Sequence, residues 1–199
     1  MTEPKGILPG SIRTDRLFLR PWAAADVDAL LDLHQESAEG LHRWYGGVLA
    51  RAHLTKADVD GYITTARAGF EDHSWIEYAA LDQATGALVG AVSLHHLDWT
   101  VPKGRVGCFV RAGAAGQGYA TEMAAAITRL AFSTLCLKRL EIRAATGNPA
   151  SHTVPRKLGY RFLTVFEKNK VGADGTLWDL EIHVRFDDAN LAGWDNQDV

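Results

Sequence analysis

The chain has 199 residues, of which 47% are hydrophobic and 23% charged, values typical of one globular domain that exclude a disordered, collagenous or coiled-coil protein. The formal net charge of −3 at pH 7 argues against a nucleic-acid scaffold held by bulk electrostatics. No apolar run approaches the roughly 18 residues that a membrane span requires, and the first residues lack the features of a signal peptide. The sequence therefore predicts a soluble, cytoplasmic protein without a membrane or nucleic-acid partner.

The first half of the chain predicts a strand, two helices and a hairpin. Residues 16–20 alternate polar and apolar side chains and stop at a proline, which is typical of a strand. Residues 23–33 carry apolar side chains at helical spacing, and Thr55 to Asp58 resembles a capping box that opens a second helix through residue 70. Apolar runs at 75–81 and 87–97 flank a turn and predict a hairpin.

The second half predicts four further strands and two helices. A strand at 105–111 leads through a Gly/Ala loop at 112–118 into a helix at 119–135. After a strand at 138–145, Asn148 and Pro149 favour the start of a short helix that ends at Gly159. Strands at 160–168 and 178–186 form a closing hairpin around residues 173–175, and the acidic segment 187–199 predicts a flexible tail.

This order of elements predicts an α/β (α+β) fold in a single domain, residues 1–199, because strands and helices are intermixed without regular alternation. Cys108 and Cys136 lie in apolar stretches without paired spacing and are interpreted as reduced. The eight histidines show no ligand spacing with acids or cysteines, so no metal site is predicted.

The strand–loop–helix stretch from Arg105 to Glu122 carries the main functional signal. Gly116 and Gly118 allow the backbone to turn tightly and to approach a ligand closely. The first turn of the following helix offers unpaired N–H groups and the positive end of the helix dipole, where phosphate groups bind. The stretch predicts a pyrophosphate site built from the main chain, and the alternative is a turn that only links a strand to a helix.

Two other phosphate-binding motifs fit this loop poorly. A Walker loop needs Gly-Lys-Ser/Thr, and this loop contains no lysine. A dinucleotide fingerprint needs Gly-x-Gly-x-x-Gly, whereas the glycines here follow the opposite spacing, Gly113-x-x-Gly116-x-Gly118. A protein that binds NAD is therefore kept only as a rival hypothesis.

Four segments, in the same order as in the family, resemble the GNAT-superfamily N-acetyltransferases. Residues 116–122, Gly-Gln-Gly-Tyr-Ala-Thr-Glu, are similar to the acetyl-CoA pyrophosphate loop of that superfamily. The other three resemble the branch that includes the RimJ/RimL ribosomal-protein N-terminal acetyltransferases. They are Thr-Asp-Arg-Leu-Phe-Leu-Arg-Pro at 14–21, Leu-His-Arg-Trp at 41–44, and Asn-Pro-Ala-Ser at 148–151 followed by Lys-Leu-Gly-Tyr at 157–160.

The resemblance implies a GNAT-like mixed, mostly antiparallel sheet of six to seven strands with helices on both faces, and acetyl-CoA as the acyl-donor cosubstrate without a metal. The strand before the loop diverges from its neighbour in this family, and its backbone pairs with the pantetheine arm, a role that falls on Phe109 and Val110. The pyrophosphate would be held by Ala115, Gly116, Gln117, Gly118, Tyr119 and Ala120. Because Gly113 and Ala115 lack the side-chain donors usual in the family, we expect main-chain N–H groups to dominate, with Arg111 or Arg156 as candidate helpers.

The resemblance also assigns roles to Asn148 and Ser151. Asn148 would contact the pantetheine, and the Ser151 hydroxyl would stabilise or protonate the leaving thiolate. The local alternative is that Asn148 caps the helix and that Ser151 satisfies a free N–H group.

The general base is not evident from the sequence. Arg105 and Leu163 stand where relatives carry acids. The candidate substitutes are His95, His96 and Asp98, because a histidine pair with a pKa near neutrality suits proton relay. Surface or packed histidines are the alternative.

The acceptor site is the part that the resemblance defines least. Trp44, Tyr45 and Trp75 are candidate walls of the acceptor pocket, or else core aromatics. Carboxylates of the first two helices would favour a cationic acceptor if they line its mouth.

The expected function is acetyl-CoA-dependent transfer to a primary amine, a protein N-terminal α-amine by branch resemblance, through direct attack in a ternary complex. Neither cysteine is placed to act as an acyl-accepting nucleophile. The alternatives are a small-molecule amine acceptor (a polyamine, an amino acid or an antibiotic) and a non-catalytic acyl-CoA-binding sensor. Family analogy also allows a homodimer through the C-terminal strands.

Overall fold

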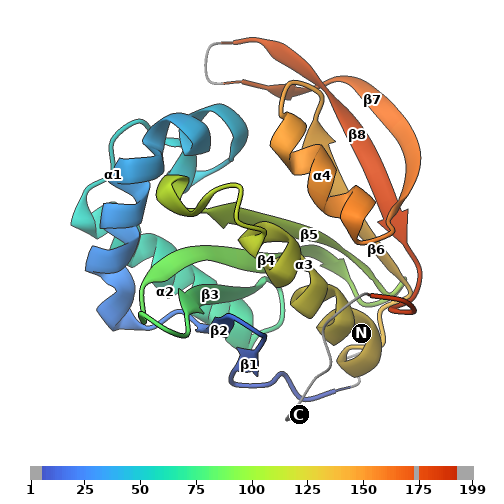
Figure 1. The fold of residues 1–199 in the computed structure, drawn as a ribbon, viewed down its shortest axis with the longest axis horizontal. Helices are drawn as coiled ribbons and strands as arrows, with labels where there is room; N and C mark the ends of the chain where they lie inside the picture. The colour runs from blue at the N-terminus through green and yellow to red at the C-terminus, as the bar shows by residue number, and fades with distance from the viewer. Residues whose placement is uncertain (1–5, 173–174, 192–199) are drawn as a thin grey trace.

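The computed structural model describes residues 6–172 and 175–191, and they contain one eight-stranded sheet (Figure 1). The strand order is β1-β2-β3-β4-β5-β6-β8-β7, and every neighbouring pair is antiparallel except β5 and β6, which are parallel. The strands are β1 (Ile12–Arg13), β2 (Leu17–Pro21), β3 (Ile76–Asp82), β4 (Leu88–Asp98), β5 (Lys103–Val110), β6 (Arg139–Ala145), β7 (Arg161–Val171) and β8 (Leu177–Arg185).

The mixed, mostly antiparallel sheet confirms the expected fold class, but it has eight strands where six to seven are expected. The additional strand is β1, which pairs Ile12 with Leu19 and Arg13 with Phe18. Two residues are too few to show the alternation of side chains by which a strand is recognised in a sequence. The predicted turn at 173–175 falls partly on residues 173–174, which lie outside the described residues.

Helices cover both faces of the sheet, and each face has its own hydrophobic core. The α1–α2 face is packed around Leu33, Ile63 and Phe109, and the α3–α4 face around Ile127, Val154 and Ile142. The helices are α1 (Val27–Trp44), α2 (Lys56–Glu71), α3 (Tyr119–Arg129) and α4 (Pro149–Lys157), with short helical turns η1 (Ala24–Asp26), η2 (Val48–Ala50), η3 (Ala112–Ala114) and η4 (Leu130–Thr134). No helix among the described residues is both long and apolar enough to traverse a bilayer.

Two helices differ from the sequence prediction. Helix α1 continues to Trp44, well beyond the predicted end at residue 33, because its apolar face continues as Leu33 and Leu41 past a polar stretch that hides the period. The predicted helix 119–135 is α3 followed by the π-helical turn η4, in which the Leu135 N–H donates to the Leu130 carbonyl five residues earlier. The predicted capping box at Thr55 and Asp58 is confirmed, with N–H to side-chain distances of 2.9 and 3.2 Å.

The parallel strands β5 and β6 separate part of the way along their length. They are paired from Lys103–Arg139 to Val106–Ile142. Beyond that point residues 107–110 of β5 pair only with β4, and residues 143–145 of β6 pair only with β8. The sheet therefore contains a V-shaped gap whose apex lies at Val106 and Ile142.

A buried carboxylate fixes the start of α3 beside this gap. Glu122, in the first turn of α3, is fully buried and accepts hydrogen bonds from the Thr14 hydroxyl at 2.5 Å and the Arg16 N–H at 2.9 Å. Its Oε2 lies 2.6 Å from Nη2 of Arg16. A carboxylate in a first helical turn also interacts favourably with the helix dipole. Glu122 thereby ties α3 to the turn between β1 and β2.

The carboxyl-terminal segment that the sequence predicts as a flexible tail, 187–199, is described only in part. Residues 187–191 follow β8, and Leu191 is buried in the core on the α3–α4 face. Residues 192–199 lie outside the described residues.

Replacing Glu122 by Gln should lower the free energy of unfolding by about 2 kcal/mol, because it removes the charge that the Arg16 guanidinium faces in a buried environment. Arg16 is partly exposed, which keeps the loss below that of a fully buried pair. Urea denaturation of the two proteins at pH 7 measures it. Lys56→Gln, which breaks the exposed ion pair with Asp28, is the control and should change the unfolding free energy by no more than the error of the measurement. Equal effects of the two substitutions would contradict the structural role of Glu122.

Candidate active site

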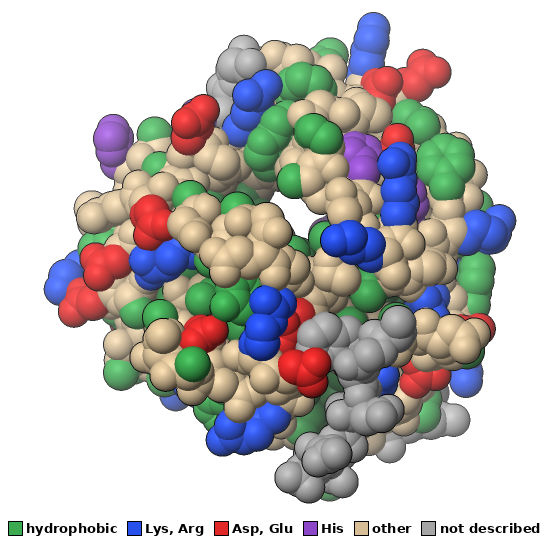
Figure 2. Space-filling view, in the orientation of Figure 1, with side chains coloured by type: hydrophobic (Ala, Val, Ile, Leu, Met, Phe, Trp, Pro, Cys, Tyr) green, Lys and Arg blue, Asp and Glu red, His purple; other side chains and the backbone are tan. Residues whose placement is uncertain are grey.

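A cavity of about 1590 Å³ occupies the gap between β5 and β6. This volume exceeds the roughly 300–1,000 Å³ of a typical small-molecule site, so it can hold two substrates together. Its walls come from α1, α2, β4, β5, the loop before α3, β6 and α4. Figure 2 shows an opening near the centre of the face, between the η3–α3 segment and α4, with Lys or Arg side chains beside it.

The predicted phosphate loop forms one wall of this cavity. Gly116 and Gly118 have φ angles of 76° and 87°, in the region that glycine adopts most readily, and Gly118 is the N-cap of α3. No main-chain N–H of residues 116–121 donates a hydrogen bond within the described part of the chain. These six groups form a concentrated set of free donors at the positive end of a helix, the environment that binds phosphate.

The lining of the cavity includes all but one of the predicted loop residues. The exception is Gln117, whose carbonyl accepts a hydrogen bond from Nη1 of Arg16 at 3.0 Å. The Arg16 guanidinium also stacks over the Tyr119 ring at 4.4 Å. Arg16 thus fixes the loop through Gln117 and Tyr119. The predicted loop residues that line the cavity are Ala115, Gly116, Gly118, Tyr119 and Ala120.

Two arginines that the sequence offers as phosphate helpers lie elsewhere. Arg111 forms an ion pair with Glu36 at 2.8 Å and donates to the Leu88 carbonyl at 3.0 Å. Arg156 is exposed, 3.8 Å from Glu181. Neither lines the cavity, whereas Lys157 of α4 does.

The free edge of β5 forms the second wall. Phe109 and Val110, the residues predicted to pair with the pantetheine arm, line the cavity beyond the point where β5 and β6 separate. Cys108 also lines it, so one cysteine does lie at the site. Burial raises the pKa of this thiol to about 11, and it therefore stays protonated and weakly nucleophilic at neutral pH.

Asn148 and Ser151 face the cavity from the start of α4. The Asn148 side chain accepts a hydrogen bond from the Ser151 N–H at 3.3 Å, and the Ser151 hydroxyl donates to the Asn148 carbonyl at 3.2 Å. Asn148 therefore caps α4, and both Asn148 and Ser151 also line the cavity, so the two interpretations are compatible. A small rotation of the Ser151 hydroxyl would let it donate into the cavity instead.

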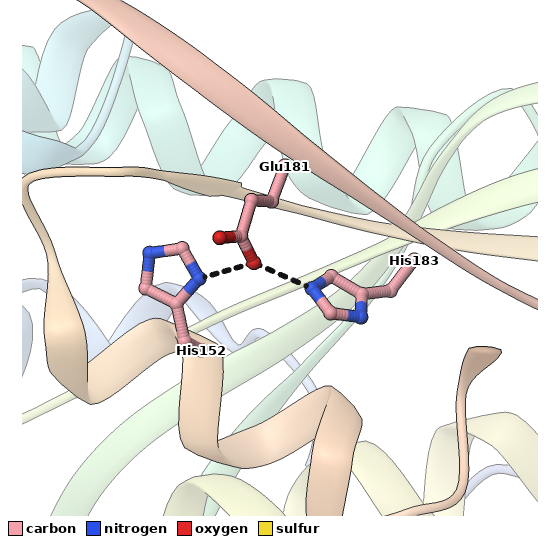
Figure 3. Close-up of side chains that lie close together, drawn as sticks. All are labelled: His152, Glu181 and His183. Atoms are coloured by element: carbon pink, nitrogen blue, oxygen red, sulfur yellow. Dashed lines mark hydrogen bonds and ion pairs between the residues drawn. The ribbon is translucent and has the colours of Figure 1, made fainter. Parts of the chain in front are cut away.

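A cluster of His152, Glu181 and His183 links α4 to strand β8 (Figure 3). Nδ1 of His152 and Nε2 of His183 lie 2.8 and 3.1 Å from the same oxygen of Glu181, and Nε2 of His152 lies 2.9 Å from the Ala145 carbonyl. The ligand atoms lie within 4.8 Å of one another, so the three residues could hold a metal ion. The contacts with Glu181 account for the arrangement without a metal, and we assign the cluster to positioning α4.

The predicted acceptor aromatics all line the cavity at its other end. Tyr45 packs edge-on against Phe109 with ring centroids 5.3 Å apart, and Trp75 packs edge-on against Tyr62 at 5.4 Å. Trp44, at the end of α1, lies against Trp178 of β8 at 5.4 Å.

This last contact is part of a bridge over the cavity, formed by Trp44, Lys170 and Trp178. The Lys170 ammonium donates to the Trp44 carbonyl. A side chain at Gly147 would collide with the Trp178 ring, so the glycine permits the ring to settle against the backbone. The bridge links the β7–β8 hairpin to α1.

The candidate bases differ in position. His95 and His96 line the cavity with ring centroids 5.1 Å apart. Burial, with the positive charges of the neighbouring His96 and Arg105, lowers the pKa of His95 to about 4, so the ring is neutral at pH 7. Asp98 accepts hydrogen bonds from two turn N–H groups, forms an ion pair with Lys103 at 3.3 Å and does not line the cavity.

A titratable group that the sequence analysis misses is Glu77 of β3. It is almost fully buried, and its Oε2 accepts hydrogen bonds from the Trp22 indole and the Tyr62 hydroxyl, both at 2.7 Å. Its Oε1 is buried without a hydrogen-bond partner among the described residues. Burial raises the pKa of Glu77 to about 7. A glutamate inside the apolar strand 75–81 is the signal that could have found it.

Comparisons with known proteins agree with this geometry. The model of the family described as "Acetyltransferase (GNAT) domain" matches residues 16–161. The Bacillus subtilis (strain 168) protein YdaF, named "Putative ribosomal N-acetyltransferase", is 28% identical over 148 residues, which cover 73% of this chain and 78% of YdaF.

Two solved structures share the fold at a TM-score of 0.81. One is the ribosomal L7/L12 alpha-N-protein acetyltransferase RimL in complex with coenzyme A, 18% identical, covering 90% of this chain and 99% of its own. The other is the microcin C7 self-immunity acetyltransferase MccE in complex with acetyl-CoA and AMP, 17% identical, covering 91% of this chain and 98% of its own.

Substituting Glu77 by Gln should remove a pH-dependent loss of stability. The folded-state pKa of about 7 lies above the ordinary value of 4.5, so the folded protein holds this proton between the two values while the unfolded chain releases it. The free energy of unfolding is therefore highest below pH 4.5, where Glu77 is protonated in both states. It falls as the pH rises from 4.5 through about 7, by about 3 kcal/mol in total, and stays at the lower value above that pH.

Chemical denaturation of both proteins from pH 4.5 to 8 measures this effect as the difference between wild type and variant. The difference should shift in favour of the variant as the pH rises. A difference that does not change with pH would show that Glu77 titrates as an ordinary carboxyl.

Proposed function

The chain belongs to the acetyltransferase (GNAT) domain family, and from that membership we propose that it transfers the acetyl group of acetyl-CoA to a primary amine, the N-terminal α-amine of a protein. The observation that carries this proposal is the cavity that joins the V-shaped gap between β5 and β6 to Gly116 and to residues 118–121, whose N–H groups are free within the described part of the chain. The names of YdaF and RimL support a ribosomal protein as the acceptor.

The cavity fits acetyl-CoA by its shape and by its donors. The N–H groups of the loop, backed by the α3 dipole, match the pyrophosphate. The edge of β5 at residues 107–110 has no strand partner on its β6 side among the described residues, so its backbone groups are free to pair with the amides of an extended pantetheine arm. Acetyl-CoA supplies an activated acyl group when it is bound.

The reaction forms a carbon–nitrogen bond and breaks the carbon–sulfur bond of the thioester. Electron density moves onto sulfur, where the Ser151 hydroxyl is the nearby proton donor that the site offers. The acceptor must lose one proton as it attacks. Direct attack is supported by the raised pKa of Cys108, which makes this thiol a poor acyl acceptor.

Two groups compete as the proton acceptor. His95 faces the cavity, but its pKa of about 4 makes it a weak base towards an alkylammonium. Glu77 has a pKa of about 7 and accepts a hydrogen bond from the hydroxyl of Tyr62, a residue that lines the cavity. Tyr62 would accept a proton from the amine side while passing its own to Glu77.

The first test is the release of free thiol from acetyl-CoA in the presence of N-terminal peptides and small amines. We expect release with peptides that have a free α-amine and none with N-blocked peptides. Binding of CoA without release on any acceptor would support a cofactor sensor instead and overturn the proposed activity.

Gly118→Glu should weaken CoA binding by about 100-fold, because it places a bulky anion where the loop offers its N–H groups. Calorimetric titration with CoA measures this. Gly10→Glu adds the same charge at an exposed glycine with open space around it and should bind CoA as the wild type does. Unchanged affinity in Gly118→Glu, with the protein folded, would show that the pyrophosphate lies elsewhere.

Ser151→Ala should lower kcat by about 10-fold or more while changing the Kd for CoA little, because the hydroxyl acts on charge that develops during transfer. Equal losses of kcat and of CoA affinity would show that Ser151 only caps the helix.

The pH dependence of kcat/KM distinguishes the two candidate bases. A relay through Glu77 gives an acidic limb near pH 7 that Tyr62→Phe removes and His95→Asn leaves in place. A limb near pH 4 that His95→Asn removes and Tyr62→Phe leaves in place assigns the base to His95.

A further inference from the structure

Two arginines stand at the apex of the V-shaped gap and line the cavity. Arg105 precedes the last paired residue of β5, and Arg143 follows the last paired residue of β6. Side chains alternate along a strand, so Arg105 lies on the same face of β5 as Phe109, which belongs to the core on the α1–α2 face. Arg143 shares that face, because it lies two residues after Glu141, which is paired in register with Arg105. Both arginines therefore line the cavity on the α1–α2 face of the sheet.

The positive charge at this apex is only partly compensated. Glu141, paired in register with Arg105, receives Arg139 at 2.6 Å on one oxygen and Arg143 at 2.8 Å on the other. The Arg105 Nε lies 3.7 Å from Glu141, beyond hydrogen-bond range. Three guanidinium groups share one carboxylate, which leaves a net charge of +2.

Arg105 in particular has free donors. Its side chain is 28% exposed, and it makes no hydrogen bond to any residue in the described ranges. A guanidinium carries five N–H donors in a planar fork that matches a carboxylate or a phosphate. Half-buried at the wall of a cavity, it is arranged to receive an oxyanion.

The neighbouring histidines lie within the electrostatic reach of the two arginines. Burial is the main cause that lowers the pKa of His95 and of His96, and the charges of Arg105 and Arg143 lower both further. Glu141 is the carboxylate that opposes them, and it acts only on the more exposed His96.

The acidic residues that line the cavity lie on the helical wall and do not neutralise the apex. Glu36 is bound by Arg111 at 2.8 Å and by the Gly113 N–H at 2.7 Å. Asp58 is bound by Arg51 at 2.7 Å. The remaining one, Glu39, is exposed on α1.

We propose that Arg105 and Arg143 bind a carboxylate or phosphate that the acceptor carries close to its reacting amine. This inference rests on the proposed function and narrows its substrate class to amines with a neighbouring oxyanion. An ammonium group without such a partner would meet a net positive wall, which disfavours polyamines. In a protein acceptor the oxyanion is an acidic side chain within the first residues, and in a small acceptor it is the carboxylate of an amino acid.

The experiment compares matched acceptors that differ in one charge. Peptides beginning Ser-Glu, Ser-Gln and Ser-Lys keep the same reacting amine, and free serine with serinamide tests the α-carboxylate as the source. We expect kcat/KM for Ser-Glu to exceed that for Ser-Gln by about 10- to 100-fold, the range of a charge-assisted hydrogen bond. Ser-Lys should be the poorest of the three.

Variants then assign the preference to the two arginines. Arg105→Gln and Arg143→Gln should each reduce the Ser-Glu to Ser-Gln ratio, mainly through KM, and Arg105→Lys should restore part of it. Lys103→Gln is the matched control, because it removes one positive charge from β5 two residues before Arg105, whereas Lys103 pairs with Asp98 at 3.3 Å and does not line the cavity. It should keep the wild-type ratio.

The outcomes separate this inference from the proposed function. Peptide turnover without preference for an acidic residue overturns the oxyanion site and leaves the proposed function standing. Turnover of serine over serinamide without peptide turnover keeps the oxyanion site and overturns the protein acceptor. No turnover of any acceptor, with CoA bound, overturns both.

Discussion

The loss of pairing between β5 and β6 after Val106 and Ile142 is the constraint on which the rest of the structure depends. Two parallel strands that stay paired would leave no space and no free backbone groups between them. Because they diverge, a row of backbone donors and acceptors that sheets normally satisfy internally faces a cavity. The loop before α3, the start of α4 and the acceptor aromatics are all placed around that gap, and each can act on a ligand only because the sheet is open there.

The electrostatics of the cavity follow the division between its two ends. At the α3 end the positive potential comes from main-chain N–H groups and requires no cationic side chain. Such a site suits a ligand group that is always the same, as the pyrophosphate of the proposed cosubstrate is. At the apex the positive potential comes from Arg105 and Arg143, where side chains can differ from one protein to another. Glu77 adds a buried carboxyl behind Tyr62 that is held near its titration point by the cost of burying its charge. Burial raises the pKa of Glu77 to about 7, which lets the carboxyl gain and lose a proton near neutrality, and the same burial lowers the stability of the fold when the carboxyl is charged.

Local signals made much of this structure predictable. The glycines at 116 and 118, the capping box at Thr55 and the Asn148–Pro149 helix start each depend on neighbours within a few residues, and the structure has all of them. What could not be predicted depends on contacts between distant segments. The buried Glu77 accepts its two hydrogen bonds from Trp22 and Tyr62, which lie far from it in the sequence, and Glu181 meets His152 only because α4 packs against the sheet. In the sequence, Arg105 is notable only because it stands where relatives carry an acidic residue. The pairing of β5 with β6 shows that it is one of three arginines around Glu141.

The contacts of Trp44 with Trp178 and of the Trp44 carbonyl with Lys170 connect α1 to the β7–β8 hairpin, so that the protein forms a closed ring around the cavity. A closed ring limits the size and shape of whatever enters it, because a ligand must approach through the openings that the bridge leaves. Under the proposed function, an extended peptide end is narrow enough to enter such an opening, whereas a broad folded surface must stop at the rim.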